Sequence, residues 1–406
     1  MKVLMVSDVY FPRVNGVSTS IRTFRQELAA LGHETDLIAP DYPAHHGDES
    51  HTFRVASRYV PLDPEDRMMK PRAVRALLPQ LHERRYDLVH IQTPFVAHYL
   101  GIEIADALGV PTMETYHTFF EEYLYHYVPL LPRSVLRGLS RRFSRRQCNR
   151  MNALVVPSSA MRDKLAEYGV SAPMHVIPTG IPMAEFPPGS GDAFRGQHGI
   201  GSRRPMLLYV GRVAYEKNID FLLRALEKAI AQIPDLLLTI AGEGPALASL
   251  KGLVARLNLQ EHVLFVGYLD RRGALLDCYR AADAFVFASR TETQGLVLLE
   301  AMALGIPVIS TAVMGTRDIV GAGRGARVPQ DNETDFAREI VNLMNDPALR
   351  AQLGAAGRAY AAEWNAAALA ARLADAYQEV IGSRRPLSSP VESRAGAALP
   401  ARATLP

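Results

Sequence analysis

Residues 284–310 have the sequence AFVFASRTETQGLVLLEAMALGIPVIS, and this stretch decides the fold class. It contains a short apolar run suited to a buried strand, a polar loop, an apolar helix-forming segment and a second short apolar run. A strand, a helix and a strand in this order predict a right-handed βαβ unit, in which the two strands are parallel. The stretch therefore indicates an α/β protein.

The same alternation extends through both halves of the chain. In the second half we expect further strands at 205–211, 236–242 and 263–267, separated by helices. In the first half we expect strands at 2–8, 33–40, 86–92, 110–117, 153–158 and 174–180, with one helix over 71–85. Two such series predict two doubly wound parallel sheets that face a ligand cleft.

Domain boundaries follow from where the alternation stops. The first domain is expected at 1–183 and the second at 203–365, because residues 182–205 are rich in Pro, Gly and polar residues, as linkers are. A helix is expected at 366–382. The tail at 383–406 has no hydrophobic period, and we expect it to be disordered.

Composition narrows the class of protein. The chain has 406 residues, is 48% hydrophobic and carries a net charge of +3, which excludes collagen-like, coiled-coil and largely disordered chains and does not indicate a nucleic-acid partner. The two cysteines, Cys148 and Cys278, have no metal-ligand spacing, so we expect neither a zinc site nor a disulfide framework and place the protein in the cytoplasm. No apolar run approaches the roughly 20 residues of a membrane span.

Two loops at strand ends offer groups for binding anions. Asn15-Gly16 allows a tight turn before a helix, and helix N-termini bind anions, although an ordinary strand-to-helix turn is the alternative. In VGRVAYEKN, Arg212 and Lys217 follow a strand and are suited to neutralising a diphosphate, although a solvated basic loop is the alternative. Neither domain opens with G-x-G-x-x-G, which disfavours a nicotinamide-dependent dehydrogenase.

Two glutamates form the most specific constellation. Glu292 lies on the loop after a strand, and Glu300 is the only charge between Glu292 and Arg317 in a largely apolar run. Burying a carboxylate is energetically costly, so a buried glutamate suggests a functional role. A carboxylate can accept hydrogen bonds from both vicinal hydroxyls of a ribose or a sugar. Two glutamates at this spacing suit a sugar nucleotide, although exposed helices are often rich in Glu.

These motifs together resemble a known family. The strings DVYFPRVNGVSTS (8–20), ETYHTFFEEY (114–123), GRVAYEKN (211–218), AGEGP (241–245), FVGYL (265–269) and TETQGLVLLEAMALGIPVIS (291–310) are similar, in this order, to the retaining glycosyltransferases of family 4. The resemblance implies a GT-B fold of two Rossmann-like domains, with the donor nucleotide held mainly by the second. It also implies that the helix at 366–382 crosses back to the first domain.

The resemblance also implies roles for individual residues. His117 is the active-site histidine and Glu292 contacts the transferred sugar, whereas a lone histidine at a strand end is more often structural. The residues it implies for donor binding are Gly16, Arg212, Lys217, Gly242, Tyr268, Leu269, Gly295 and Glu300. Of these, Arg212 and Lys217 bind the diphosphate and Glu300 the ribose, while Tyr268 and Leu269 lie near the base.

The chain departs from the family's pattern at two places. The usual Asn-Gly-Val/Ile-Asp after the last strand of the first domain is Thr179-Gly180-Ile181-Pro182, and the usual Phe-Gly between the two glutamates is Gln294-Gly295. The second departure alters the pocket beside the donor sugar. No Asp-x-Asp pair occurs, so we expect no metal and no cofactor, with the sugar nucleotide as co-substrate and retention by front-side attack.

The acceptor is suggested by two basic stretches, 70–85 and 132–150. The second interleaves Leu136, Leu139 and Phe143 with arginines, which suits an anionic membrane surface at the inner face of the cell membrane, although a solvated helix is the alternative. The arginines expected at that surface are Arg137, Arg141, Arg142, Arg145 and Arg146. The segment 116–132 is similar to bacterial enzymes that glycosylate diacylglycerol.

The leading hypothesis is therefore transfer of glucose from UDP-glucose to a membrane glycerolipid. GDP-mannose as donor, with a lipid or glycan acceptor, remains open because both donors share ribose and diphosphate. A catalytically silent sugar-nucleotide-binding module is the alternative from another class, and we expect it to have lost at least one of five residues. All five are present: His117, Arg212, Lys217, Glu292 and Glu300.

Overall fold

The first domain is built on a parallel sheet of seven strands. A computed structural model describes residues 1–43, 50–60, 63–117, 133–182, 186, 188–271 and 273–383. The strand order is β3-β2-β1-β6-β7-β8-β9, and neighbouring strands pair in parallel. The strands are β1 (Lys2–Val6), β2 (Glu34–Pro40), β3 (Thr52–Val55), β6 (Leu88–Ile91), β7 (Thr112–Thr115), β8 (Ala153–Val156) and β9 (Met174–Val176). The helices are α1 (Gly16–Ala30), α2 (Pro71–Arg75), α3 (Leu78–Arg84), α4 (Val96–Leu108), α6 (Arg133–Cys148) and α7 (Ser159–Glu167).

The second domain holds a parallel sheet of six strands in the order β12-β11-β10-β13-β14-β15. The strands are β10 (Met206–Val210), β11 (Leu237–Ala241), β12 (Val263–Gly267), β13 (Ala284–Phe287), β14 (Val308–Ser310) and β15 (Ala326–Arg327). The helices are α8 (Gly191–Gln197), α9 (Ile219–Ile230), α10 (Leu247–Arg256), α11 (Ala274–Ala281), α12 (Leu296–Ala303), α13 (Thr316–Val320), α14 (Glu333–Asn345) and α15 (Pro347–Glu363). The predicted fold class, two doubly wound parallel-sheet domains, is confirmed.

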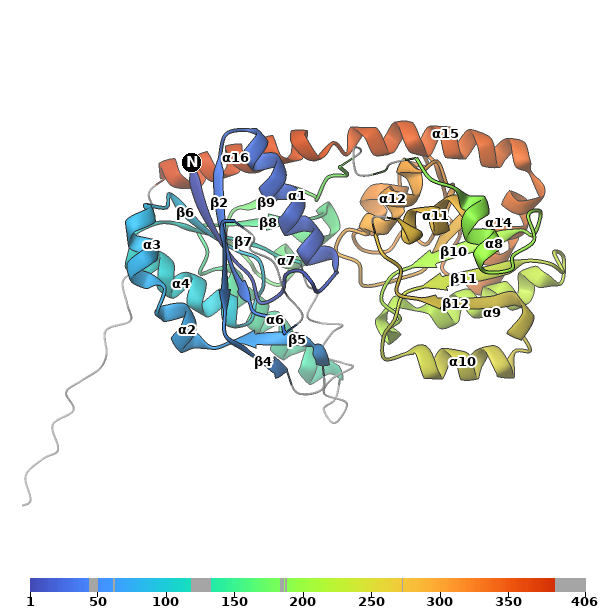
Figure 1. Ribbon diagram of the computed structural model, residues 1–406, viewed down its shortest axis with the longest axis horizontal. Helices are drawn as coiled ribbons and strands as arrows, with labels where there is room; N and C mark the ends of the chain where they lie inside the picture. The colour runs from blue at the N-terminus through green and yellow to red at the C-terminus, as the bar shows by residue number, and fades with distance from the viewer. Residues whose placement is uncertain are drawn as a thin grey trace, which may run out of the picture.

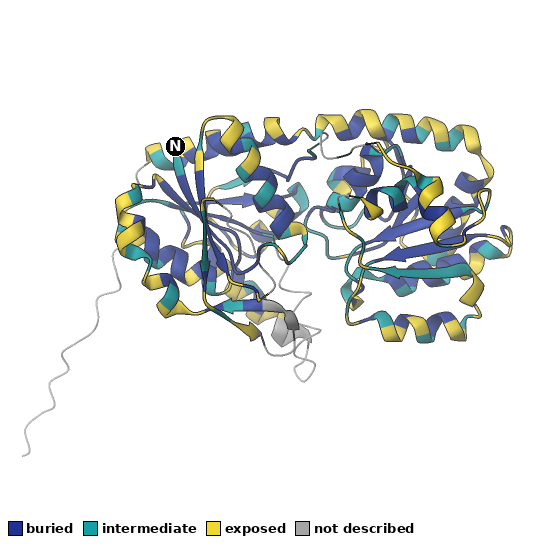
Figure 2. Cartoon of the chain, viewed as in Figure 1, coloured by how far each residue is buried: buried dark blue, intermediate teal, exposed yellow. Residues whose placement is uncertain are grey.

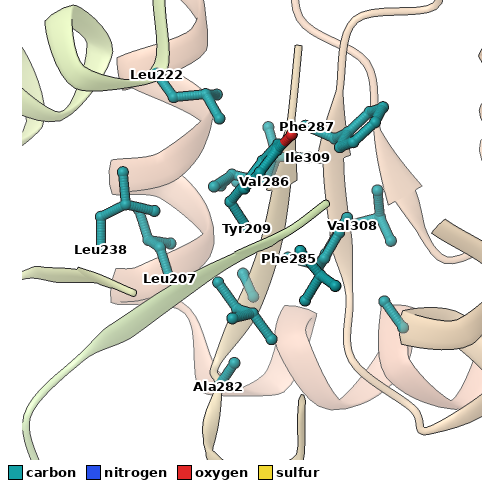
Figure 3. Packing of buried hydrophobic residues seen from close by; sticks show 14 of the residues in the cluster. Leu207, Tyr209, Leu222, Leu238, Ala282, Phe285, Val286, Phe287, Val308 and Ile309 are labelled. Carbon is teal, nitrogen blue, oxygen red and sulfur yellow. The ribbon is translucent and has the colours of Figure 1, made fainter. Parts of the chain in front are cut away.

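The central strands are buried on both faces because helices cover both sides of each sheet, and Figure 2 shows them dark blue while the outer helix faces are exposed. In the second domain, Tyr209 of β10 stacks on Phe287 of β13, with ring centroids 5.8 Å apart (Figure 3). Continuous apolar runs are what such strands require. This packing fixes the strand ends from which the polar loops emerge.

The chain passes between the domains twice, and the two crossings lie side by side. The Ile181 N–H donates to the Trp364 carbonyl at 2.8 Å, and Ile181 forms an isolated parallel bridge with Asn365. A Cβ on Gly180 would lie 2.4 Å from the Ala366 Cα, so only glycine permits this approach.

The last helix, α16 (Ala366–Ser383), belongs to the first domain by its packing, and α15 and α16 run along both domains (Figure 1). Leu369 and Leu373 of α16 are buried in one apolar cluster with Ile21 of α1. The Tyr377 hydroxyl lies 2.6 Å from Nδ1 of the buried His90 on β6. On its other side, Nε2 of His90 lies 2.7 Å from the Thr115 hydroxyl of β7.

Three local expectations are corrected. The helix expected over 71–85 is broken into α2 and α3, because Pro79 has no N–H to donate and sits in the first turn of α3. The connection expected at 182–205 contains α8, whose Phe194 is buried in the core of the second domain. The strand β3 and the antiparallel pair β4 (Ser57–Val60) and β5 (Asp63–Met69) were not predicted. The expectation of a disordered tail falls on 384–406, which lie outside the described residues.

Replacing Tyr377 by Phe tests how strongly α16 is tied to the first sheet. The change removes the hydroxyl bonded to His90 and leaves a buried ring nitrogen without that partner, so we expect the free energy of unfolding to fall by about 1–3 kcal/mol. Urea unfolding measures the change. Tyr99→Phe is the control, because Tyr99 is exposed. Equal unfolding free energies for the Tyr377 variant and the unmodified chain would contradict the role given to this contact.

Candidate functional site

The loop after β10 carries the two predicted cations of the second domain. The Tyr209 hydroxyl donates to the Arg212 carbonyl at 3.1 Å, which fixes the start of the loop. A Cβ on Gly242 would lie 1.9 Å from the Gly211 carbonyl oxygen, so glycine at 242 allows the ends of β10 and β11 to approach closely. Arg212 and Lys217 are both half-buried. The loop therefore places two cations at the carboxyl edge of the sheet.

Lys217 and Glu292 form an ion pair between neighbouring loops. Lys217 Nζ lies 2.6 Å from Glu292 Oε1, and both side chains are about one-fifth exposed (21% and 19%). Asn218, the next residue, adopts a left-handed conformation with φ of 57° and donates from Nδ2 to the Ala288 carbonyl at 3.1 Å. The ion pair thus brings together Lys217, which is expected to bind the diphosphate, and Glu292, which is expected to contact the transferred sugar.

Glu300 is buried and held from two sides. Its side chain is on α12, and the residue is 4% exposed. The Tyr279 hydroxyl of α11 donates to Oε2 at 3.0 Å, and the Arg271 guanidinium forms an ion pair with Oε1. The nearby Glu300 carboxylate raises the pKa of Arg271, which stays charged. Arg271 and Tyr279 thus give this carboxylate an ion pair and a hydrogen bond within an otherwise apolar run.

Gly295 begins the turn into α12. Its φ is +96°, a backbone conformation that residues other than glycine rarely adopt, and a Cβ there would lie 3.2 Å from the Thr316 side chain.

In the first domain, Gly16 begins α1 after Asn15, whose Oδ1 accepts from the Ser18 N–H at 2.8 Å. A Cβ on Gly16 would meet no atom within 4 Å, so space surrounds this N-terminus.

His117 follows β7 at the carboxyl edge of the first sheet. Its Nε2 lies 3.2 Å from Oε1 of Gln92, a buried residue that follows β6. Its carbonyl accepts from the Thr293 hydroxyl of the second domain at 3.1 Å. Burial lowers the pKa of His117 to about 4, so the imidazole is neutral near pH 7.

A cavity of about 540 Å³ lies between the two domains beside Glu300. Both domains line it, including Thr19 and Arg22 of α1, Pro182 of the crossing, and Tyr268, Arg271 and Glu300 of the second domain. Tyr268 is exposed, whereas Leu269 packs against the core of the second domain. Tyr268 and Glu300 are thus the predicted donor-binding residues that line this cavity, and Leu269 lies outside its lining.

Helix α6 turns its small and polar face inward. Among its residues whose side chains the structure describes, 137–148, the buried ones are Ser140, Ser144, Gln147 and Cys148. Leu139 and Phe143 are 53% and 37% exposed, so the apolar residues lie outside with the arginines. Among the arginines expected at a surface, four are exposed: Arg137, Arg142, Arg145 and Arg146.

The fifth, Arg141, is only partly exposed, and its guanidinium lies over the Tyr168 ring at 5.1 Å. In the basic stretch at 70–85, two arginines form ion pairs within the chain: Arg75 pairs with Glu103, and Arg84 pairs with Asp36. The motif residues 118–132 and the Leu136 side chain lie outside the described residues.

Sequence reasoning missed several residues that shape the site. Arg271 lies in a loop without a marked motif, and the apolar spacing around Tyr279 is that of an ordinary core helix. Gln294 was noted only as a departure and the neighbouring Thr293 was not singled out, although both contact the first domain. Among the residues that the structure describes, no cluster of His, Cys, Asp and Glu suits a metal ion, and no helix is long and apolar enough to cross a membrane.

Comparison with known proteins gives consistent matches over both domains. Residues 14–185 match Glycosyltransferase Family 4, and residues 191–360 match Glycosyl transferases group 1. The chain is 35% identical over 320 residues to the alpha-monoglucosyldiacylglycerol synthase of Streptococcus pneumoniae, covering 76% of this chain and 71% of that one. It is 29% identical over 385 residues to a GDP-mannose-dependent alpha-mannosyltransferase of Mycobacterium tuberculosis, covering 89% and 93%. The structure superimposes on sucrose-phosphate synthase from Thermosynechococcus elongatus with a TM-score of 0.74 at 24% identity, covering 94% and 99%.

Replacing Tyr279 by Phe tests the support of Glu300. The change removes a hydrogen bond to a charged carboxylate and frees that group to rotate, so we expect binding of a nucleoside diphosphate to weaken about tenfold. Calorimetric titration with UDP and with GDP measures the effect. The control is Tyr360→Phe, because the Tyr360 hydroxyl donates to the Asp318 carbonyl at 3.2 Å and does not line the cavity. Unchanged affinity for both nucleotides would refute the role of Tyr279.

Proposed function

We propose, since the chain belongs to the GT-B glycosyltransferases with group 1 and family 4 domains, that it transfers glucose from UDP-glucose to a membrane glycerolipid such as diacylglycerol. It is a hexosyltransferase, and its relatives include enzymes named for glycolipid products. The observation that carries the proposal is the 35% identity to an alpha-monoglucosyldiacylglycerol synthase over three quarters of the chain.

Charged groups at the sheet edge and at the cavity support binding of a sugar nucleotide. We assign Arg212 and Lys217, at the sheet edge, to the diphosphate, and Glu300, which lines the cavity and is held by Arg271 and Tyr279, to the ribose hydroxyls. Tyr268 lies at the cavity wall, where the base is expected. Two cations next to a breaking phosphate bond stabilise the leaving group electrostatically. We therefore infer a metal-independent reaction without a cofactor.

The reaction proposed for this geometry is front-side transfer with retention. The acceptor hydroxyl oxygen bonds to the anomeric carbon while the bond from that carbon to the phosphate oxygen breaks. The acceptor proton passes to the departing phosphate oxygen, so no protein base is required. We assign His117 of the first domain and Glu292 of the second to contacts with the sugar. The neutral imidazole of His117 adds no positive charge beside the developing oxocarbenium ion.

The outward face of α6 supports a lipid acceptor. Exposed Leu139 and Phe143 are suited to entering the headgroup region, while Arg142 and Arg146 beside them attract anionic headgroups. The buried Gln147 side chain of the same helix donates to the Pro94 carbonyl at 2.8 Å, just before α4. This face fits a peripheral position at the inner surface of the cell membrane, with no nucleic-acid partner.

GDP-mannose remains the second candidate donor. The observation that favours it is the similarity over 89% of the chain to a GDP-mannose-dependent alpha-mannosyltransferase. The groups assigned to ribose and diphosphate serve both donors equally. The base and the sugar therefore decide the donor, and we assign Tyr268 and Leu269 to distinguishing the base.

A transfer assay with UDP-glucose and GDP-mannose, each with diacylglycerol and with free sugars, tests the proposal. We expect transfer from UDP-glucose to diacylglycerol, unaffected by EDTA because protein cations serve the diphosphate. Lys217→Ala and Glu300→Ala should lower the rate at least about 100-fold, since each removes a charge expected at the donor. The control is Lys251→Ala, a change at an exposed residue of α10. Full activity of Lys217→Ala, or a strict requirement for magnesium, would refute the mechanism.

Sedimentation with vesicles containing an anionic phospholipid tests the α6 surface. We expect binding to fall steeply with salt, and each of Arg142→Gln and Arg146→Gln to remove about 1 kcal/mol. Leu139→Ser combined with Phe143→Ser should weaken binding without changing its salt dependence, because the contribution lost is apolar. Arg256→Gln on α10, also exposed, is the control. Salt-independent binding, or equal losses for the control, would count against this surface.

A further inference from the structure

The two departures from the family's pattern, at Thr179 and Gln294, contact each other across the domain interface. The Gln294 side-chain Oε1 accepts from the Thr179 N–H at 2.8 Å, and its Nε2 donates to the Thr179 carbonyl at 2.7 Å. Both residues are buried, with exposed fractions of 4% and 6%. One side chain of the second domain therefore satisfies both backbone groups of a single residue of the first.

This two-point contact depends on the chemistry of an amide. Among side chains that are ordinarily uncharged at neutral pH, only Asn and Gln present a donor and an acceptor in the planar arrangement of a peptide group. Phe at 294 would leave both backbone groups of Thr179 without these partners in a buried place. Thr179 extends the contact, because its hydroxyl donates to the Ser20 hydroxyl of α1 at 2.7 Å. Gln294 is thereby linked to the helix that begins at Gly16.

The neighbours of Gln294 in the same loop are also held. The Thr293 hydroxyl donates to the His117 carbonyl at 3.1 Å, and the Ser158 hydroxyl donates to the Thr293 carbonyl at 2.7 Å. The Gly315 N–H donates to the Glu292 carbonyl at 2.9 Å. The loop that carries Glu292 is thus joined directly to the backbone that carries His117.

We propose that Gln294 is a positioning residue that sets the register of the Glu292 loop against the His117 strand. It acts through the backbone of Thr179 and through its own loop, and it does not touch the sugar. This inference rests on the proposed function, because that function assigns Glu292 and His117 to opposite sides of the transferred sugar. Gln294 holds the two sides at the spacing that the reaction requires.

Positioning and simple packing lead to different measurements. Of the groups assigned to the nucleotide, Arg212, Lys217 and Glu300 belong to the second domain and only Gly16 to the first, so loss of register affects nucleotide binding much less than the chemical step. The sugar is contacted from both domains, so loss of register lowers kcat. Loss of packing alone would instead lower the melting temperature, and it would not lower kcat more than nucleotide affinity.

The first test is Gln294→Met, which keeps length and removes both hydrogen bonds. We expect kcat to fall about 10- to 100-fold, as for a small misplacement of reacting groups, while the Kd for UDP or GDP changes less than about twofold. The control is Gln352→Met on the exposed face of α15. An unchanged kcat, or a nucleotide affinity that falls as much as kcat, overturns the proposal.

The second test, Gln294→Glu, keeps side-chain size and remains informative if the methionine variant does not fold. The introduced carboxylate accepts from the Thr179 N–H but faces its carbonyl with a second acceptor. Burial raises the pKa of such a carboxyl, and once protonated its O–H donates to that carbonyl. The ratio of variant kcat to wild-type kcat should therefore rise as the pH is lowered. A ratio that does not change with pH overturns the proposal.

A double-mutant cycle with Thr293→Val adds a third measurement. Thr293→Val removes the bond to the His117 carbonyl and keeps the shape of the side chain. If both residues set one register, the double variant with Gln294→Met loses less kcat than the product of the single losses. Independent, multiplicative losses overturn the proposal.

The outcomes separate this inference from the proposed function. Each variant rate is expressed as a ratio to the wild-type rate, measured with the donor that the wild type uses. If no acceptor is found, release of hexose to water is the reaction that is measured. A wild-type chain that neither transfers hexose from any sugar nucleotide to an acceptor nor releases it to water contradicts the proposed function. Active wild type with equally active Gln294 variants contradicts only the positioning role.

Discussion

The structure depends on one constraint, the burial of two parallel sheets on both faces. Helices cover the sheets so completely that polar chemistry is left to the loops at the carboxyl edges. In the second domain the packing of Tyr209 and Phe287 fixes the ends of β10 and β13, and the loops that follow carry Lys217 and Glu292. The ion pair between these loops is therefore a consequence of strand order, since β10 and β13 are neighbours in the sheet.

A second constraint comes from the contacts between the two domains. Within the described residues, two chain crossings connect them, together with hydrogen bonds to backbone groups of Thr179, His117 and Thr293. The Ser159 hydroxyl and N–H add a contact to the Asp318 carboxylate at 2.7 and 2.6 Å. Hydrogen bonds of this kind are specific in geometry, which suits a site whose two walls must meet in a defined register.

The sequence predicted what continuous apolar runs and loop motifs encode, namely the main strands, the fold class and the approximate place of the charged loops. It could not predict the strand at 63–69, where DPEDRMM lacks apolar alternation, or the helix break at Pro79. Helical spacing alone does not say which face is buried, so the packing of Ser140 was missed. Arg271 and Tyr279 were missed because their contact with the buried carboxylate joins α11 and its preceding loop to α12, which no local pattern reveals.

The packing of α16 has a consequence for synthesis on the ribosome. The apolar cluster that covers one face of the first sheet includes Val3, Leu37 and Leu373, so its last members are translated after the whole second domain. The first domain emerges early but lacks part of its core until the chain is nearly complete. During that interval the nascent sheet exposes an apolar face, and final closure of the amino-terminal half awaits the carboxyl-terminal helix.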